Sequence, residues 1–158
     1  SIISRTYYHN MVTHLLEAAY QREVYKKVDN GESLTAPVLN KLMRNVYEQF
    51  FGDAVELTDG MELTWMRQPH YYMGLYSYTY SAGLTIGTVV SQKIKKEGQK
   101  AVDAWLETLK AGGSKNPVEL AKVAGVDITT NAPLKSTIVY ISELVDEVEI
   151  LTNEIEHN

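Results

Sequence analysis

The chain has 158 residues, of which 44% are hydrophobic and 22% charged, and its formal net charge at pH 7 is -5. This balance is typical of a folded globular domain, while the acidic charge argues against binding to nucleic acid or to an anionic membrane. The chain contains no cysteine, no apolar run long enough to cross a membrane and no signal-peptide pattern. We therefore expect a cytoplasmic protein whose residues 1–158 form a single unit that binds neither nucleic acid nor membrane.

Two amphipathic helices are predicted at the beginning of the chain. Residues 4–28 repeat apolar side chains at the i, i+3, i+4 and i+7 spacing of a helix with one buried face. The Asn-Gly pair at 30–31 suits the left-handed conformation that ends a helix, and Thr35 is placed to cap a second helix that ends at Gly52. The short connection predicts that the two helices pack antiparallel.

The middle of the chain combines helix signals with a strand-like alternation. A short helical turn is predicted over residues 62–67, before Pro69, because proline disfavours helical geometry in the residue that precedes it. The run Leu-Tyr-Ser-Tyr-Thr-Tyr-Ser at 75–81 alternates with a period of two, as a strand does. However, no turn signal follows before Gly98, and strands usually have about 3 to 10 residues. We therefore predict a helix over residues 71–96.

Three further helices are predicted, over residues 99–110, 116–124 and 131–156, each bounded by glycine, asparagine or proline signals. The last of them carries apolar side chains along one stripe and acidic side chains on the opposite face. The predicted fold class is all-α.

The tyrosines are the chemical feature that stands out. Eleven residues are Tyr, and five of them fall between Tyr71 and Tyr80. In one continuous helix Tyr71 and Tyr78, seven residues apart, share a face, and Gly74 beside them leaves room for a ligand backbone. A neutral phenol is a good hydrogen-bond donor at pH 7 and can stabilise an oxyanion that forms on an attacked carbonyl.

A second stripe on another side of the same predicted helix is formed by Tyr72, Tyr76 and Tyr80. The simplest division makes one stripe a packing surface and directs the hydroxyls of the other into a cleft. The alternative is an aromatic packing seam whose hydroxyls are satisfied by water or backbone. Spacing alone leaves both interpretations open.

The histidines do not form a recognisable metal site. His9 and His14 are five residues apart, which places them about 140° apart around an α-helix, and the other two are His70 and His157. The chain has no His-Glu-x-x-His motif, no phosphate-binding glycine loop and no Gly-x-Ser-x-Gly elbow. The sequence therefore predicts no metal ligands and no complete active site.

Two runs of residues resemble a known family. Residues 70–72 read His-Tyr-Tyr, and residues 76–83 read Tyr-Ser-Tyr-Thr-Tyr-Ser-Ala-Gly. Residues 105–120 read Trp-Leu-Glu-Thr-Leu-Lys-Ala-Gly-Gly-Ser-Lys-Asn-Pro-Val-Glu-Leu, and Ala-Gly-Val-Asp follows at 124–127. These runs are similar to the C-terminal signature and closing segment of oligoendopeptidase F, a zinc metallopeptidase of the thimet-oligopeptidase-like M3 family. The resemblance extends over roughly residues 5–152, and its Lys-Ala-Gly-Gly-Ser-Lys run is quite specific.

The resemblance implies the helical C-terminal part of a zincin-type peptidase that cleaves oligopeptides inside a deep channel. In that family a His-Glu-x-x-His helix and a downstream glutamate hold zinc, and the glutamate of the motif is the general base for the attacking water. By the same resemblance, His70, Tyr71 and Tyr78 are the catalytic residues that donate to the oxyanion. Tyr72, Tyr76 and Gly74 are the residues expected to bind the substrate.

The zinc-binding portion of the family has no counterpart in this sequence. We therefore expect a C-terminal fragment of the parent peptidase that binds no zinc tightly and hydrolyses nothing alone. Its expected partners are an oligopeptide substrate, the missing N-terminal part of the same polypeptide and a second copy bound through an exposed apolar face. Two alternatives stay open, a stand-alone, non-catalytic helical module that binds peptides or other proteins, and a helical domain whose tyrosines only pack.

Overall fold

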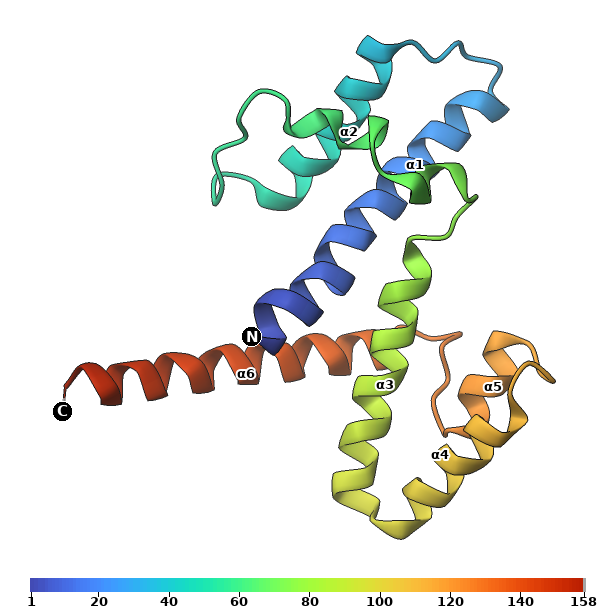
Figure 1. Ribbon diagram of the computed structural model, residues 1–158, viewed down its shortest axis with the longest axis vertical. Coiled ribbons are helices and arrows are strands. Elements are labelled where there is room, and N and C mark those ends of the chain that lie inside the picture. The colour runs from blue at the N-terminus through green and yellow to red at the C-terminus, as the bar shows by residue number, and fades with distance from the viewer. Residues whose placement is uncertain (158) are drawn as a thin grey trace. The chain divides into compact units, whose positions relative to one another are not determined.

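The computed structural model describes residues 1–157, which form helices joined by turns and loops and contain no strand (Figure 1). The all-α prediction is confirmed. The elements in chain order are η1 (Ile2–Thr13), α1 (His14–Asp29), α2 (Ala36–Phe51), η2 (Met61–Met66), η3 (Pro69–Tyr72), α3 (Tyr78–Glu97), α4 (Gln99–Ala111), α5 (Pro117–Val123) and α6 (Ala132–Glu156). Among the described helices, none is both long and apolar enough to cross a lipid bilayer.

The contacts divide the chain into two compact units. One unit is Tyr8–Ser81, and the other combines Ser1–Tyr7 with the chain from Ala82 onward. All the residues singled out above as candidate site residues belong to the unit Tyr8–Ser81. The candidate site therefore lies within this unit alone.

Helices α1 and α2 pack on one another and form the core of the unit Tyr8–Ser81. The buried side chains at its centre are Leu16, Tyr20, Met43 and Val46. Met43 is completely inaccessible to solvent. Partly buried aromatic rings surround this centre, among them Trp65 and Tyr71 from the two 3-10 helices, so the core also fixes the segment that leads to His70.

The first predicted helix is not α-helical throughout. Residues Ile2–Thr13 form a π-helix, in which hydrogen bonds join residues five apart rather than four. This spacing aligns His9 with His14, and the centroids of the two rings lie 4.5 Å apart. The prediction that these histidines lie on different faces is wrong, because it assumed the α-helical rotation of 100° per residue.

The helix predicted over residues 71–96 is interrupted. The 3-10 helix η3 ends at Tyr72, α3 begins only at Tyr78, and Gly74 between them has a φ of +67°. Positive φ is easily adopted by glycine and strained for other residues, so the chain reverses here instead of continuing as a helix. The amide of Gln21 on α1 fastens the turn by donating to the carbonyl oxygen of Gly74 at 2.6 Å. Tyr71 and Tyr78 therefore do not share one helix, and the argument that places them on one face is wrong.

The helix boundaries predicted from capping residues agree well with the structure, although the caps differ in detail. Asn116 accepts a hydrogen bond from the backbone nitrogen of Glu119, as an N-cap side chain does. Thr35 and Asn131 occupy the same position before α2 and α6, but neither side chain makes a capping hydrogen bond.

The second unit has its own small core, formed by Val90, Ala124 and Val126 with partly buried neighbours from α3 and α4. Helices α4 and α5 contact one another within it. The long helix α6 keeps most of its apolar side chains exposed, and Ile155 is 77% exposed. The predicted apolar stripe of this helix is therefore present but uncovered.

Candidate functional site

A group of polar and aromatic side chains surrounds His70. We call this group the His70 cluster; its members are His14, Glu17, Gln68, His70, Tyr76, Ser77 and Tyr80. They come from the first turn of α1, from η3 and the residue before it, and from the two residues before α3 and the first turn of α3. The turn at Gly74 makes the cluster possible, because it folds the start of α3 back toward η3.

At the base of the cluster is the buried carboxylate of Glu17. Its Oε2 lies 2.7 Å from His14 Nδ1 and accepts a hydrogen bond of 2.9 Å from Ser77 Oγ. Its Oε1 accepts a hydrogen bond of 3.0 Å from Gln68 Nε2. His14 is only 1% exposed, and Ser77 is fully buried. Three donors converge on one acid, which is the environment that a carboxylate needs when it is removed from water.

The imidazole of His70 is held from both of its nitrogens. Nδ1 lies 2.6 Å from Gln68 Nε2, and Nε2 lies 3.1 Å from the hydroxyl oxygen of Tyr80. The ring of Tyr76 stacks on His70 with centroids 5.4 Å apart and planes at 18°. The ring of Tyr80 stacks in turn on His14 at 4.0 Å. Hydrogen bonds and ring contacts together leave His70 in one orientation.

The two phenols of the cluster are also linked to each other. A hydrogen bond with Tyr76 raises the pKa of Tyr80, and burial and the negative charge of Glu17 raise it further. A hydrogen bond raises the pKa of a phenol when it stabilises the neutral form, so this contact favours the protonated state of Tyr80. Tyr76 is thus the outer end of the chain, and its side chain is 37% exposed.

The other predicted site residues lie in different surroundings. Tyr71 packs against the core with its ring 5.2 Å from that of Tyr20, and burial, reinforced by Glu17, raises its pKa above the usual value for tyrosine. Tyr78 and Tyr72 are 51% and 73% exposed, and Gly74 forms the turn between them. The structure therefore brings together His70, Tyr76 and Tyr80, but not Tyr71 and Tyr78.

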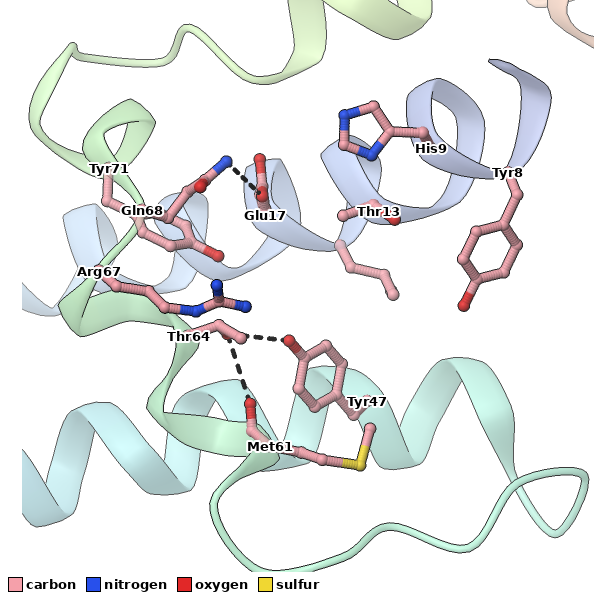
Figure 2. A pocket seen from close by; sticks show the side chains of 11 residues that line it. Tyr8, His9, Thr13, Glu17, Tyr47, Met61, Thr64, Arg67, Gln68 and Tyr71 are labelled. Atoms are coloured by element: carbon pink, nitrogen blue, oxygen red, sulfur yellow. Dashed lines mark hydrogen bonds between the residues drawn. The ribbon is translucent and has the colours of Figure 1, made fainter. Parts of the chain in front are cut away.

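A pocket of about 370 Å³ lies on the other side of Glu17 and Gln68 (Figure 2). Tyr8, His9 and Thr13 of η1 form part of its wall, and residues of α2 and η2 form another part. Figure 2 shows the side chain of Arg67 reaching into the pocket beside Gln68 and Tyr71. His70, Tyr76 and Tyr80 do not line this pocket, whereas Glu17 and Gln68 belong to both the pocket and the cluster.

Four members of the cluster were not predicted from the sequence, namely His14, Glu17, Gln68 and Ser77. A signal for the first two does exist, because a histidine and an acid three residues apart on a helix can face each other. Gln68 gives no such signal, since its role depends on a contact with Glu17 across 51 residues of sequence.

The donor set of the cluster does not fit zinc. One ligand atom from each of His14, Glu17 and His70 can be chosen so that all three lie within 4.8 Å of one another. The amide nitrogen of Gln68 bridges two of these residues, at 3.0 Å from Glu17 Oε1 and 2.6 Å from His70 Nδ1. The spacing of 2.7 Å between His14 Nδ1 and Glu17 Oε2 is that of a hydrogen bond with a proton between the atoms. Zinc would need these atoms unprotonated and directed at one centre about 2.0–2.2 Å away.

Comparison with known proteins shows the family of this chain. The model of peptidase family M3 matches residues 4–140. This chain belongs to peptidase family M3. The predicted resemblance to oligoendopeptidase F is thereby confirmed at the level of the family, and the relatives described next confirm it in detail.

Several relatives of the M3 chain are oligopeptidases. It is 33% identical over 141 residues to oligopeptidase PepF of Bacillus subtilis (strain 168), which covers 89% of this chain and 21% of that protein. It is 28% identical over 140 residues to the plasmid-encoded oligoendopeptidase F of Lactococcus lactis subsp. cremoris, covering 89% of this chain and 23% of that protein.

A solved structure agrees with this assignment. The crystal structure of oligoendopeptidase-F from Enterococcus faecium superimposes with a TM-score of 0.88 at 27% identity, covering 94% of this chain and 28% of that chain. The M3 chain therefore spans between about a fifth and three tenths of the length of the relatives described here.

Proposed function

We propose that this chain is the C-terminal, substrate-contacting part of a zinc metalloendopeptidase that hydrolyses oligopeptides. The observation that carries the proposal is the His70 cluster, in which one imidazole and two phenols are joined by hydrogen bonds beside an exposed turn. Membership of family M3 and the oligopeptidase names of the relatives support the reaction class.

We assign His70 and Tyr76 as the donors to the oxyanion, with Tyr80 as the phenol that holds them together. A peptide carbonyl attacked by water develops negative charge on its oxygen, and fixed neutral donors stabilise that charge without reorganising. The raised pKa of Tyr80 keeps this phenol protonated well above neutral pH. We further propose that Tyr72 and Gly74, which are exposed next to the cluster, contact the substrate backbone. The roles given to Tyr71 and Tyr78 by the resemblance stay predictions.

Zinc supplies Lewis acidity and a nucleophilic water in metallopeptidases. Because the His70 cluster does not fit zinc, we place the zinc ligands of the enzyme outside residues 1–157. The 158-residue chain is accordingly expected to cleave no peptide, with or without added zinc. Chelator-sensitive cleavage of an oligopeptide by the purified chain would contradict this part of the proposal.

A chimera tests the role of the cluster in catalysis. The segment of Bacillus subtilis oligopeptidase PepF that matches this chain is replaced by residues 1–158, and cleavage of a fluorogenic oligopeptide is measured with zinc present. We expect the chimera to be active and His70→Ala to lower kcat by about 10²- to 10³-fold, as the loss of one oxyanion donor does. An active chimera that is unaffected by His70→Ala would refute the catalytic role of His70. The alternative of a stand-alone binding module would then remain.

If the chimera fails to fold, binding to the chain itself gives the answer. A phosphinic oligopeptide, whose phosphinate imitates the tetrahedral oxyanion, is titrated into the labelled 158-residue chain and followed by NMR. We expect the side-chain signals of His70 and Tyr76 to shift, and no change in either would contradict the proposal. The cytoplasmic location and the self-association through an apolar face stay predictions, and the second is argued below for α6.

A further inference from the structure

The side chains beneath His70 include a buried acid and an amide to which the proposed reaction gives no role. Glu17 is buried and makes its hydrogen bonds with His14, Gln68 and Ser77, not with the phenols. Gln68 lies between this acid and the imidazole and contacts both of them. Their arrangement determines where the protons of the cluster are.

The orientation of the Gln68 amide follows from Glu17. A carboxylate only accepts hydrogen bonds, so the amide group 3.0 Å from Glu17 Oε1 must present its NH2 and not its oxygen. Rotating the amide by 180° would place two acceptor oxygens against each other in a buried site, at a high cost in free energy. His14 and Ser77 donate to the other oxygen of Glu17, which keeps the carboxylate from turning.

The protonation of His70 follows from the amide. The NH2 group has two protons, and with one donated to Glu17 the second points to His70 Nδ1 at 2.6 Å. Nδ1 must then be an acceptor without a proton. The single proton of the neutral imidazole is left on Nε2, which lies 3.1 Å from Tyr80 Oη and thus donates into the phenol chain.

We propose that Glu17 and Gln68 are positioning residues that hold His70 as its Nε2–H tautomer, whose proton is directed to Tyr80 in the free chain and to the oxyanion when substrate is bound. The importance of this for catalysis rests on the proposed function, whereas the tautomer itself is a property of the chain. Without the hydrogen bonds from Gln68 to Glu17 and His70, the proton of His70 is free to move to Nδ1. Nε2 would then present a lone pair, which repels an oxyanion instead of stabilising it.

The tautomer is measured directly in the 158-residue chain. Long-range proton–nitrogen NMR spectra of labelled histidine distinguish the Nε2–H form, the Nδ1–H form and the imidazolium. We expect His70 to show the Nε2–H pattern when it is neutral. An Nδ1–H pattern in the unchanged chain would overturn the proposal at once.

Two substitutions of Gln68 distinguish the effect of its hydrogen bonds from the effect of its side-chain packing. Gln68→Leu keeps the bulk of the side chain but removes both hydrogen bonds, so we expect the single-tautomer pattern to be lost. Gln68→Glu places an acceptor against His70 Nδ1, so we expect a proton to appear on Nδ1. An unchanged Nε2–H pattern in Gln68→Glu would overturn the proposal, because a packing role does not reverse the tautomer.

A matched control is available on α4. Gln99 donates to Asp103 on an exposed face, so Gln99→Leu makes the same chemical change away from His70. It should leave the His70 signals unchanged. Backbone amide spectra of every variant show whether the fold is retained, and Glu17→Gln should weaken the tautomer preference in the same direction as Gln68→Leu.

Kinetics in the chimera then separates the two proposals. Partners that orient functional histidines contribute about 10- to 100-fold in activity, so Gln68→Leu should lower kcat by this factor and leave KM nearly unchanged. If His70→Ala abolishes activity but Gln68→Leu changes neither kcat nor the tautomer, the positioning role is refuted and the proposed function survives. If His70→Ala has no effect on the activity of the chimera, the proposed function fails, whichever tautomer His70 adopts.

Discussion

The same residue type serves two purposes in this chain, and the surroundings decide which. Tyr20 and Tyr71 lie in and against the core, where burial raises the pKa of both hydroxyls. Tyr76 and Tyr80 lie next to an imidazole and are linked by hydrogen bonds that leave one phenol accessible. The sequence predicts that the tyrosines divide into a packing set and a polar set, but not which residues belong to each.

The division between Tyr76 and Tyr78 can be tested in the chimera. Tyr76→Phe removes one hydroxyl from the end of the hydrogen-bonded chain, and we expect kcat to fall by about 10²- to 10³-fold. Tyr78→Phe removes a hydroxyl that is exposed at the start of α3, and we expect less than a twofold change. A large fall in kcat for Tyr78→Phe with little change for Tyr76→Phe would instead support Tyr78 as the oxyanion donor, as the sequence resemblance implies.

The core residue Met43 gives a prediction about stability. This side chain is 0% exposed among Leu16, Tyr20 and Val46, so Met43→Ala leaves a cavity and should lower the free energy of unfolding by about 2–5 kcal/mol. Met66→Ala, at a position that is 53% exposed, is the matched control and should change it by less than about 0.5 kcal/mol. Urea denaturation measures both, and equal effects would show that the assigned core is incorrect.

At the scale of elements, the sequence predicts the helices well and their internal geometry less well. Apolar periodicity and stop signals such as Gly52 and Gly112 are local, so they predict α2 and α4 to within one or two residues. The π-helix η1 and the turn at Gly74 were missed for the same reason. The turn at Gly74 is held by a hydrogen bond from the distant Gln21, which no local pattern contains, and the apolar repeat of residues 4–28 fits an α-helix without indicating the wider π turns.

The capping residues of α5 and α2 provide a paired test. Asn116 accepts the backbone hydrogen bond of Glu119, whereas the side chain of Thr35 caps nothing. Asn116→Ala should therefore lower the free energy of unfolding by about 0.5–2 kcal/mol, and Thr35→Ala by a few tenths at most. A larger loss for Thr35→Ala in thermal or urea denaturation would contradict the capping geometry.

Helix α6 gives a prediction about association. Its exposed apolar side chains include Ile138, Val145 and Ile155, and the free energy of burying them favours contact with another surface. We expect sedimentation of the purified 158-residue chain to show a monomer–dimer equilibrium that Ile138→Glu and Val145→Glu shift to the monomer. A chain that stays monomeric at high concentration would contradict this expectation.

At the scale of the whole molecule, the buried phenols make stability depend on alkaline pH. The pKa values of Tyr20 and Tyr71 are raised in the folded chain above the reference value of 10.0, mainly by burial. The unfolded chain therefore releases these protons first as the pH rises. Their contribution is complete below pH 10 and is lost above it, with a slope of up to about 1.4 kcal/mol per pH unit for each tyrosine.

Urea denaturation at a series of pH values measures this slope. Phenylalanine does not titrate, so Tyr71→Phe should reduce by one the number of protons released on unfolding above pH 10. The free energy of unfolding should then fall less steeply with pH. Tyr72→Phe, at a position that is 73% exposed, should leave the slope unchanged. The interpretation fails if both substitutions change the slope equally.

Because η1 completes each turn with an extra residue, a deletion of one residue between Ile2 and Thr13 can be absorbed by tightening a turn to the α form. The residues upstream of the deletion would then keep their positions around the axis relative to α1, because the tightened turn still completes one revolution. His9 would stay beside the ring of His14, four residues away instead of five, and Tyr8 would stay in the wall of the pocket that Arg67 enters. Circular dichroism would hardly register the change. The opening segment can thus lose one residue and still present the same side chains to the pocket.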